Sequence, residues 1–89
     1  MPDQPKQFTL VITRAFYKDL QKINKPDQIR IRKSLSDIES DPYKGRKVVS
    51  AEIGQYRGRV GNYRIRYDIS GQQVTILRVI KREDVYRHF

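Results

Sequence analysis

Residues 55–69 constrain the fold most, because apolar and charged side chains alternate strictly along them. Between 63 and 69, one face would carry Tyr63, Ile65, Tyr67 and Ile69, and the other Arg64, Arg66 and Asp68. Between 55 and 60, one face would carry Tyr56, Gly58 and Val60, and the other Arg57 and Arg59. This period of two is typical of strands buried on one face. With Gly61-Asn62 as a turn, the pattern predicts an antiparallel hairpin with one arginine-rich face.

Two further strands are predicted on either side of this hairpin. Residues 73–80 follow a turn at Ser70-Gly71 and are almost continuously apolar, which favours a central strand covered on much of both faces. Residues 7–13 are rich in β-branched and aromatic side chains and predict a first strand.

The segment between the first strand and the hairpin predicts two short helices. Thr13 can cap a helix that runs to about Ile23, with Phe16, Leu20 and Ile23 along one stripe. Pro26 suits the first turn of a second helix, which runs to about Glu39 with Ile31, Leu35 and Ile38 on one face. Asp41-Pro42 would end it, and residues 43–52 are predicted to form a polar, basic loop.

The predicted order is therefore β-α-α-β-β-β with a short C-terminal tail. This is an α+β fold in which a helical hairpin packs on a mainly antiparallel four-stranded sheet. The 89 residues suffice for one domain, expected over residues 7–89, and the polar residues 1–6 are expected to form a disordered tail.

Composition excludes several kinds of site. The chain has no cysteine and one histidine, which argues against a disulfide framework, a thiol nucleophile and a cysteine- or imidazole-rich metal site. We expect neither a cofactor nor a metal. No apolar run has the length of a signal peptide core or a membrane span, so a soluble, cytoplasmic protein without a membrane partner is expected.

The charge is strongly positive and uneven. The formal net charge is +9; residues 1–45 have nine basic and six acidic groups, and residues 46–89 have ten and four. Eight of the ten basic residues in the second half are arginines, whose planar fork pairs with phosphate oxygens. A nucleic acid or an acidic protein is the expected partner.

The predicted hairpin collects the candidate RNA-binding residues on one solvated sheet face: Arg57, Arg59, Arg64 and Arg66. Four guanidinium groups repel one another unless a polyanion neutralises them, and only Asp68 offsets them there. The alternative is a charged face that protects a sheet edge, although that device normally mixes signs or uses lysine.

Tyrosines lie among these cations and could stack on unpaired bases. The alternation places Tyr56, Tyr63 and Tyr67 toward the core instead. Tyr86 follows the last strand in a charged segment, so we expect it to be exposed and functional.

The motifs Tyr56-Arg57-Gly58-Arg59, Tyr63-Arg64-Ile65-Arg66-Tyr67 and Lys81-Arg82-Glu83-Asp84-Val85-Tyr86, together with the order of elements, resemble the RelE/ParE toxin superfamily. The resemblance covers about residues 7–87. Its RelE branch implies cleavage of messenger RNA in the ribosomal A site, without metal, by attack of the substrate's own 2′-hydroxyl. By the same resemblance, the catalytic positions fall on these residues: Arg57, Arg59, Arg64, Arg82 and Tyr86. Arg64 and Arg82 are then expected to matter more than Arg66 and Arg78.

One departure concerns the general base. Arg57 and Arg59 stand where RelE commonly has lysine, and a guanidinium does not deprotonate in proteins. Positioning and electrostatic stabilisation of the transition state could replace a base. Otherwise Tyr86, Glu52 or His88 could accept or supply a proton; Glu52 is more simply a solvated loop residue, and His88 part of a frayed terminus.

The resemblance also implies a co-expressed, acidic antitoxin that supplies operator DNA binding for both proteins. Two other functions remain open: a ParE-like toxin that poisons DNA gyrase without nuclease activity, and an RNA- or DNA-binding module without catalysis.

Overall fold

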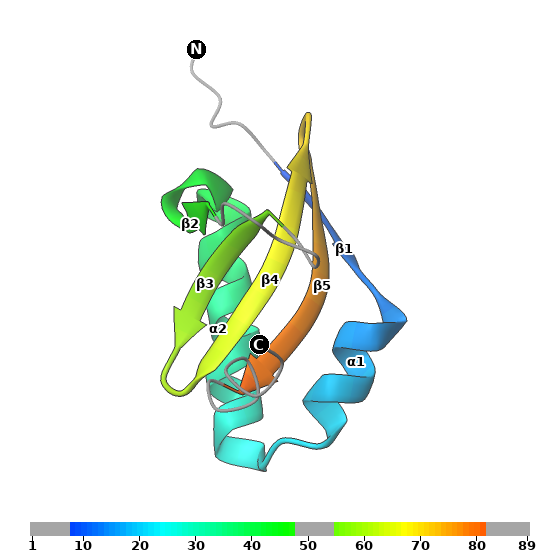
Figure 1. The fold of residues 1–89 in the computed structure, drawn as a ribbon, viewed down its shortest axis with the longest axis vertical. Coiled ribbons are helices and arrows are strands. Elements are labelled where there is room, and N and C mark those ends of the chain that lie inside the picture. Colours follow the sequence, from blue (N-terminus) through cyan, green and yellow to red (C-terminus); the bar gives the residue numbers. More distant parts are fainter. Residues whose placement is uncertain (1–7, 48–54, 82–89) are drawn as a thin grey trace.

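The computed structural model describes residues 8–47 and 55–81. In chain order, the elements are β1 (Thr9–Ile12), α1 (Arg14–Gln21), α2 (Lys25–Ser40), the 3-10 turn η1 (Pro42–Lys44), β2 (Arg46–Lys47), β3 (Tyr56–Val60), β4 (Tyr63–Ser70) and β5 (Gln73–Lys81). They form one sheet with the strand order β1-β5-β4-β3-β2, and α2 runs behind it in Figure 1. The predicted α+β class and helical hairpin are confirmed.

The two predicted hairpins are present: β3, β4 and β5 are antiparallel neighbours. The first predicted strand, β1, runs parallel to β5 at one edge of the sheet. The other edge holds a strand that was not predicted. β2 lies within the segment predicted as a loop, where Arg46 and Lys47 pair with Arg57 and Tyr56. That part of the loop prediction is wrong, because two residues are too few to show a periodic pattern. The last hairpin turn also lies one residue later than predicted, with Gly71 at φ +60° after a strand that includes Ser70.

The helices begin at the residues that can cap them. Thr13 accepts a hydrogen bond at Oγ1 from the backbone N–H of Phe16, at 3.2 Å. Asn24 accepts one at Oδ1 from Asp27, at 3.0 Å. Each bond satisfies an amide that the helix itself leaves without a partner. α2 begins at Lys25 and has Pro26 in its first turn, as predicted.

The core lies between the helices and the sheet. Its buried residues come from α1, α2, β4 and β5, together with Phe8 just before β1: Phe8, Phe16, Leu20, Ile31, Ile38, Ile65, Tyr67, Val74, Ile76 and Val79. Tyr56 and Tyr63 are half-buried against it, so the prediction that the three sheet tyrosines face the core is confirmed. Tyr67 is 1% exposed, and its hydroxyl donates a 2.7 Å hydrogen bond to the Pro42 carbonyl. This bond ties η1, at the end of α2, to the central strand.

The alternation in β5 is interrupted at Leu77. Ile76 pairs with Tyr67 of β4 and Arg78 pairs with Arg66, so two adjacent residues of β4 face three of β5. Such a β-bulge shifts the phase of the side chains beyond it. Val74, Ile76 and Val79 are therefore buried on the core side, while Thr75, Leu77, Arg78 and Ile80 are half-buried. The expected coverage of both faces of β5 is only partial.

Candidate nucleic-acid interface

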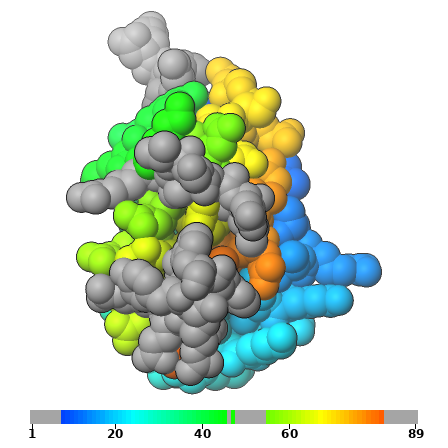
Figure 2. Space-filling model, in the orientation of Figure 1, coloured from blue at the N-terminus to red at the C-terminus, as the bar shows by residue number. Residues whose placement is uncertain are grey.

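The face of the sheet turned away from the helices carries a cluster of arginines, here called the arginine face: Arg57, Arg59, Arg64 and Arg66. This is the side toward the reader in Figure 1, where α2 lies behind the strands. Figure 2 shows the same side, with atoms of β3, β4 and β5 visible in lime, yellow and orange. The predicted grouping of these four arginines on one face is what the strand register produces.

The register places the arginines in two rows across the strands. Arg57 of β3 pairs with Arg66 of β4, which pairs with Arg78 of β5. Arg59 pairs with Arg64, which pairs with Ile80. Directly opposite residues have Cβ atoms about 4.5–5.5 Å apart, and like charges in such pairs destabilise a sheet. The arrangement thus has an electrostatic cost that a bound polyanion would relieve.

The four arginines differ in exposure. Arg59 is exposed, and Arg57 and Arg66 are half-buried. Arg64 is only 9% exposed, so the expectation that it lies on a solvated face is wrong in this respect. It belongs to the central strand, where Arg59 on one side and Ile80 on the other flank its long side chain.

Burial and neighbouring like charges shift the pKa of one residue of the arginine face, Arg66. Burial lowers the pKa of the Arg66 guanidinium, and Arg57 and Arg64 lower it further, while Asp68 opposes them. Asp68 is the only carboxylate that β3, β4 and β5 place on this face in the described chain, and it accepts a 2.6 Å hydrogen bond from the backbone N–H of Gln55. Among the described residues, the face therefore has an excess of positive charge.

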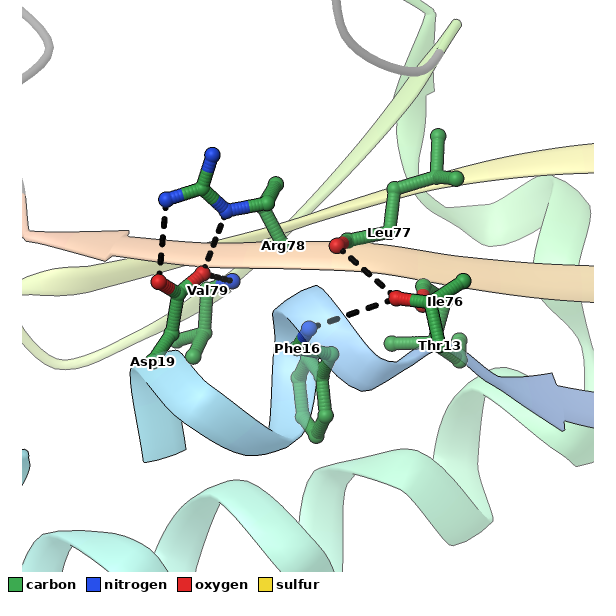
Figure 3. Close-up of polar contacts among 7 residues, drawn as sticks. All are labelled: Thr13, Phe16, Asp19, Ile76, Leu77, Arg78 and Val79. Atoms are coloured by element: carbon green, nitrogen blue, oxygen red, sulfur yellow. Dashed lines mark hydrogen bonds and ion pairs between the residues drawn. The ribbon is translucent and has the colours of Figure 1, made fainter. Parts of the chain in front are cut away.

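Helix α1 supplies an ion pair at the border of this face that could not be predicted from the sequence. Asp19 accepts hydrogen bonds from Nε and Nη2 of Arg78, at 2.6 and 2.9 Å, and from the backbone N–H of Val79, at 3.2 Å (Figure 3). This hydrogen bonding raises the pKa of Arg78. The partners are 59 residues apart in sequence, so no local pattern joins them.

A groove of about 660 Å³ lies between α2 and the outer edge of β3. Ile38, Gly58 and Tyr67 line part of it, Asp37 and Asp41 line the α2 side, and Lys44, Arg57 and Arg59 supply three basic groups. The groove therefore shares Arg57 and Arg59 with the arginine face, and its two carboxylates are the part that would repel phosphates.

Four residues singled out in the sequence lie outside the described residues: Glu52, Arg82, Tyr86 and His88. Their predicted roles remain predictions, as does the disordered tail over residues 1–6.

Within residues 8–47 and 55–81, no three potential metal ligands of the His, Cys, Asp or Glu type gather in one place. In the same segments, no helix combines the length and apolar character needed to cross a membrane.

Comparison with known proteins identifies the family. Residues 10–86 match the model of the ParE toxin of the type II toxin-antitoxin system parDE. The chain is also 31% identical to the toxin RelE3 of Methanocaldococcus jannaschii over 91 residues, covering 90% of this chain and 97% of the relative.

Solved structures agree with these matches. The RelBE2 toxin-antitoxin complex of Mycobacterium tuberculosis contains a chain with a TM-score of 0.76 and 26% identity, with 85% of this chain and 99% of that chain covered. The RelB-RelE complex of Methanococcus jannaschii contains one with a TM-score of 0.71 and 27% identity, with 89% and 98% covered. The chain thus belongs to the RelE/ParE family of toxins of type II toxin-antitoxin systems.

Proposed function

We propose that this toxin is an endoribonuclease that cleaves messenger RNA, in the A site of the ribosome, through its arginine face. The observation that carries the proposal is the strand register, which sets Arg57 opposite Arg66 and Arg59 opposite Arg64. A cluster of cations on a sheet face that no helix of the described chain covers suits a chain of phosphates. The similarity to RelE-named toxins supports the same branch of the family.

The arginines would act by charge and position. The 2′-hydroxyl oxygen attacks the adjacent phosphorus while the bond to the 5′-oxygen breaks. The products are a 2′,3′-cyclic phosphate and a 5′-hydroxyl end. Negative charge accumulates on the phosphoryl oxygens in the transition state, and donors already in place there lower the barrier. Arg64, the most buried residue of the arginine face, is our candidate for this task.

The attacking hydroxyl must lose a proton, and the leaving oxygen must gain one. Arginine remains protonated and serves poorly as a base. We therefore assign proton transfer to Tyr86, with Arg82 as a further phosphate ligand, as the resemblance implies. Changing Tyr86 to Phe tests this assignment, because stacking on a base survives in Phe and hydroxyl chemistry does not. Single-turnover cleavage should slow strongly with RNA affinity nearly intact; an unchanged rate would leave Tyr86 with stacking alone.

A second protein should neutralise the toxin. The similar solved structures are toxin-antitoxin complexes, which supports an antitoxin partner for this chain. With a net charge of +9, the toxin should be bound by an acidic, amphipathic segment that covers the arginine face. Operator DNA would then be bound through the antitoxin. Normal growth of cells that express the toxin alone at high level would contradict a toxic activity.

The test of the cleavage reaction is the chemistry of the RNA ends. Programmed ribosomes incubated with the toxin should yield fragments that end in 2′,3′-cyclic phosphate. Intact RNA would contradict the proposal.

The match to the ParE model favours one competing function, poisoning of DNA gyrase without nuclease activity. Gyrase-dependent DNA breaks with intact messenger RNA would establish that alternative. Binding of RNA with neither outcome would indicate a non-catalytic RNA-binding module.

A further inference from the structure

We propose that Arg78 is an additional phosphate-binding residue beside the arginine face and that Asp19 of helix α1 is the residue that positions it. The inference rests on the proposed function in one respect, namely that the ligand of this face is RNA. It extends the binding surface from β3 and β4 to β5 and assigns a role to α1.

The β-bulge at Leu77 is the first observation. Val74 and Ile76 are fully buried on the core side of β5, so strict alternation would direct Arg78 into the core as well. The bulge shifts the phase by one residue, so that Val79 takes the core position and Arg78 pairs with Arg66. Bulges commonly re-aim a side chain beside a functional site. Here the bulge adds a third arginine to the row of Arg57 and Arg66.

The bulged segment is held in place by helix α1. β1 ends at Ile12, opposite Ile76, and beyond that point α1 lies against β5. The hydroxyl of Thr13 donates to the carbonyls of Ile76 and Leu77, at 2.9 and 3.1 Å. Asp19 accepts from the backbone N–H of Val79 two residues further on, at 3.2 Å. The backbone on both sides of Arg78 is therefore fixed by side chains of the same helix.

The ion pair leaves part of Arg78 available for a ligand. Nε and Nη2 donate to Asp19, and the third nitrogen, Nη1, points away from α1 in Figure 3. The Arg78 side chain is 39% exposed, whereas that of Asp19 is 14% exposed. A guanidinium can bind a carboxylate along one edge and a phosphate oxygen along another. Because its conformation is already set, Arg78 would lose little entropy on binding.

The test is the salt dependence of binding to a single-stranded 2′-O-methyl RNA oligonucleotide, which lacks the attacking hydroxyl. Arg78→Gln should weaken binding about tenfold. It should also flatten the log–log salt slope by about 0.7, the value for one lost phosphate contact with a single strand. The matched control is Arg32→Gln, which removes the same charge from an exposed position on α2 and should leave the slope unchanged.

Asp19→Asn distinguishes positioning from a merely structural contact. Arg78 keeps its charge in this variant, so the salt slope should stay near the wild-type value while affinity falls a few-fold. The double variant should bind like Arg78→Gln alone, because Asp19 acts only through Arg78. In cleavage assays, Arg78→Gln should raise KM with kcat unchanged, which indicates a contact made equally in the ground and transition states.

Thermal unfolding of each variant establishes that binding is measured on folded protein. If Arg78→Gln does not fold, Arg78→Lys keeps the charge without the planar fork; it should retain the slope and lose affinity a few-fold. Two results would overturn this inference and leave the proposed function standing. One is a salt slope of RNA binding that is the same for Arg78→Gln and wild type. The other is an RNA affinity of Arg78→Lys equal to that of wild type. A wild-type chain that binds no RNA would overturn both.

Discussion

Arg59 of β3 and Arg64 of β4 are direct cross-strand partners on the sheet face that carries no helix of the described chain. Two cations in this position repel each other, and cross-strand pairs of this kind change stability by roughly 0.2–1 kcal/mol. The protein retains this pair although it lowers the stability of the fold, which is typical of a surface that serves binding.

Replacing Arg59 with Gln should therefore stabilise the protein and weaken its binding to RNA. We expect the free energy of unfolding to rise by roughly 0.2–1 kcal/mol in low salt, where the repulsion is least screened. Urea unfolding and RNA titration of the same preparation would measure both effects. A variant that is less stable and binds RNA as tightly as wild type would contradict the cost assigned to this pair.

Arg64 and Arg66 should differ in their effect on the reaction. Arg64→Gln should lower the single-turnover rate by about 10²–10³, the loss typical of a donor to a transition-state oxyanion. Arg66→Gln should mainly weaken binding, by about tenfold or less, since the resemblance implies no catalytic role for Arg66. Equal losses in the two variants would indicate a diffuse binding surface. Thermal unfolding of Arg64→Gln controls for the burial of that side chain.

The sequence was sufficient to predict the helices and strands that have a periodic pattern. It was not sufficient where contacts between distant residues determine the conformation. Alternation along residues 63–69 correctly assigned Ile65 and Tyr67 to the core and Arg66 to the other face. The bulge at Leu77 broke the same rule in β5, because it depends on contacts with Thr13 and not on local composition. The burial of Arg64 could not be predicted either, because alternation indicates a face and not how closely neighbours enclose it.

The hydroxyl of Tyr67 should matter more for stability than for activity. Tyr67→Phe leaves the Pro42 carbonyl without its 2.7 Å hydrogen bond in a buried place. Such a loss costs about 1–3 kcal/mol, measurable by urea unfolding. Tyr63→Phe is the matched control on the same strand, because Tyr63 is half-buried and its hydroxyl makes no side-chain hydrogen bond to any described residue. Equal stability of the two variants would contradict the role assigned to the Tyr67–Pro42 bond.

The same tyrosine should make stability depend on alkaline pH. Burial raises the pKa of Tyr67 to about 12, whereas an unfolded tyrosine titrates near 10. The folded state therefore favours the protonated phenol, and its contribution is complete below about pH 10 and is lost as pH rises through about 12. Wild type should lose stability relative to Tyr67→Phe across this interval. Parallel curves for the two proteins would contradict the raised pKa.

Two glycines of the groove offer a matched test of packing. A Cβ at Gly45 would collide with the Tyr67 hydroxyl and lie 3.0 Å from the Arg57 carbonyl. At Gly58, its nearest neighbour would be Ile38 Cδ1 at 3.6 Å, an ordinary contact. Gly45→Ala should thus destabilise the protein by about 1–3 kcal/mol, and Gly58→Ala should be far better tolerated. Thermal unfolding would show the difference, and equal losses would contradict the close approach at Gly45.

The most direct measurement of the central claim is the chemistry of messenger RNA ends on programmed ribosomes, compared between wild type and Arg64→Gln. The proposed function predicts 2′,3′-cyclic phosphate ends with wild type and a rate lower by about 10²–10³ with the variant. Intact messenger RNA with wild type, accompanied by gyrase-dependent DNA breaks, would contradict it.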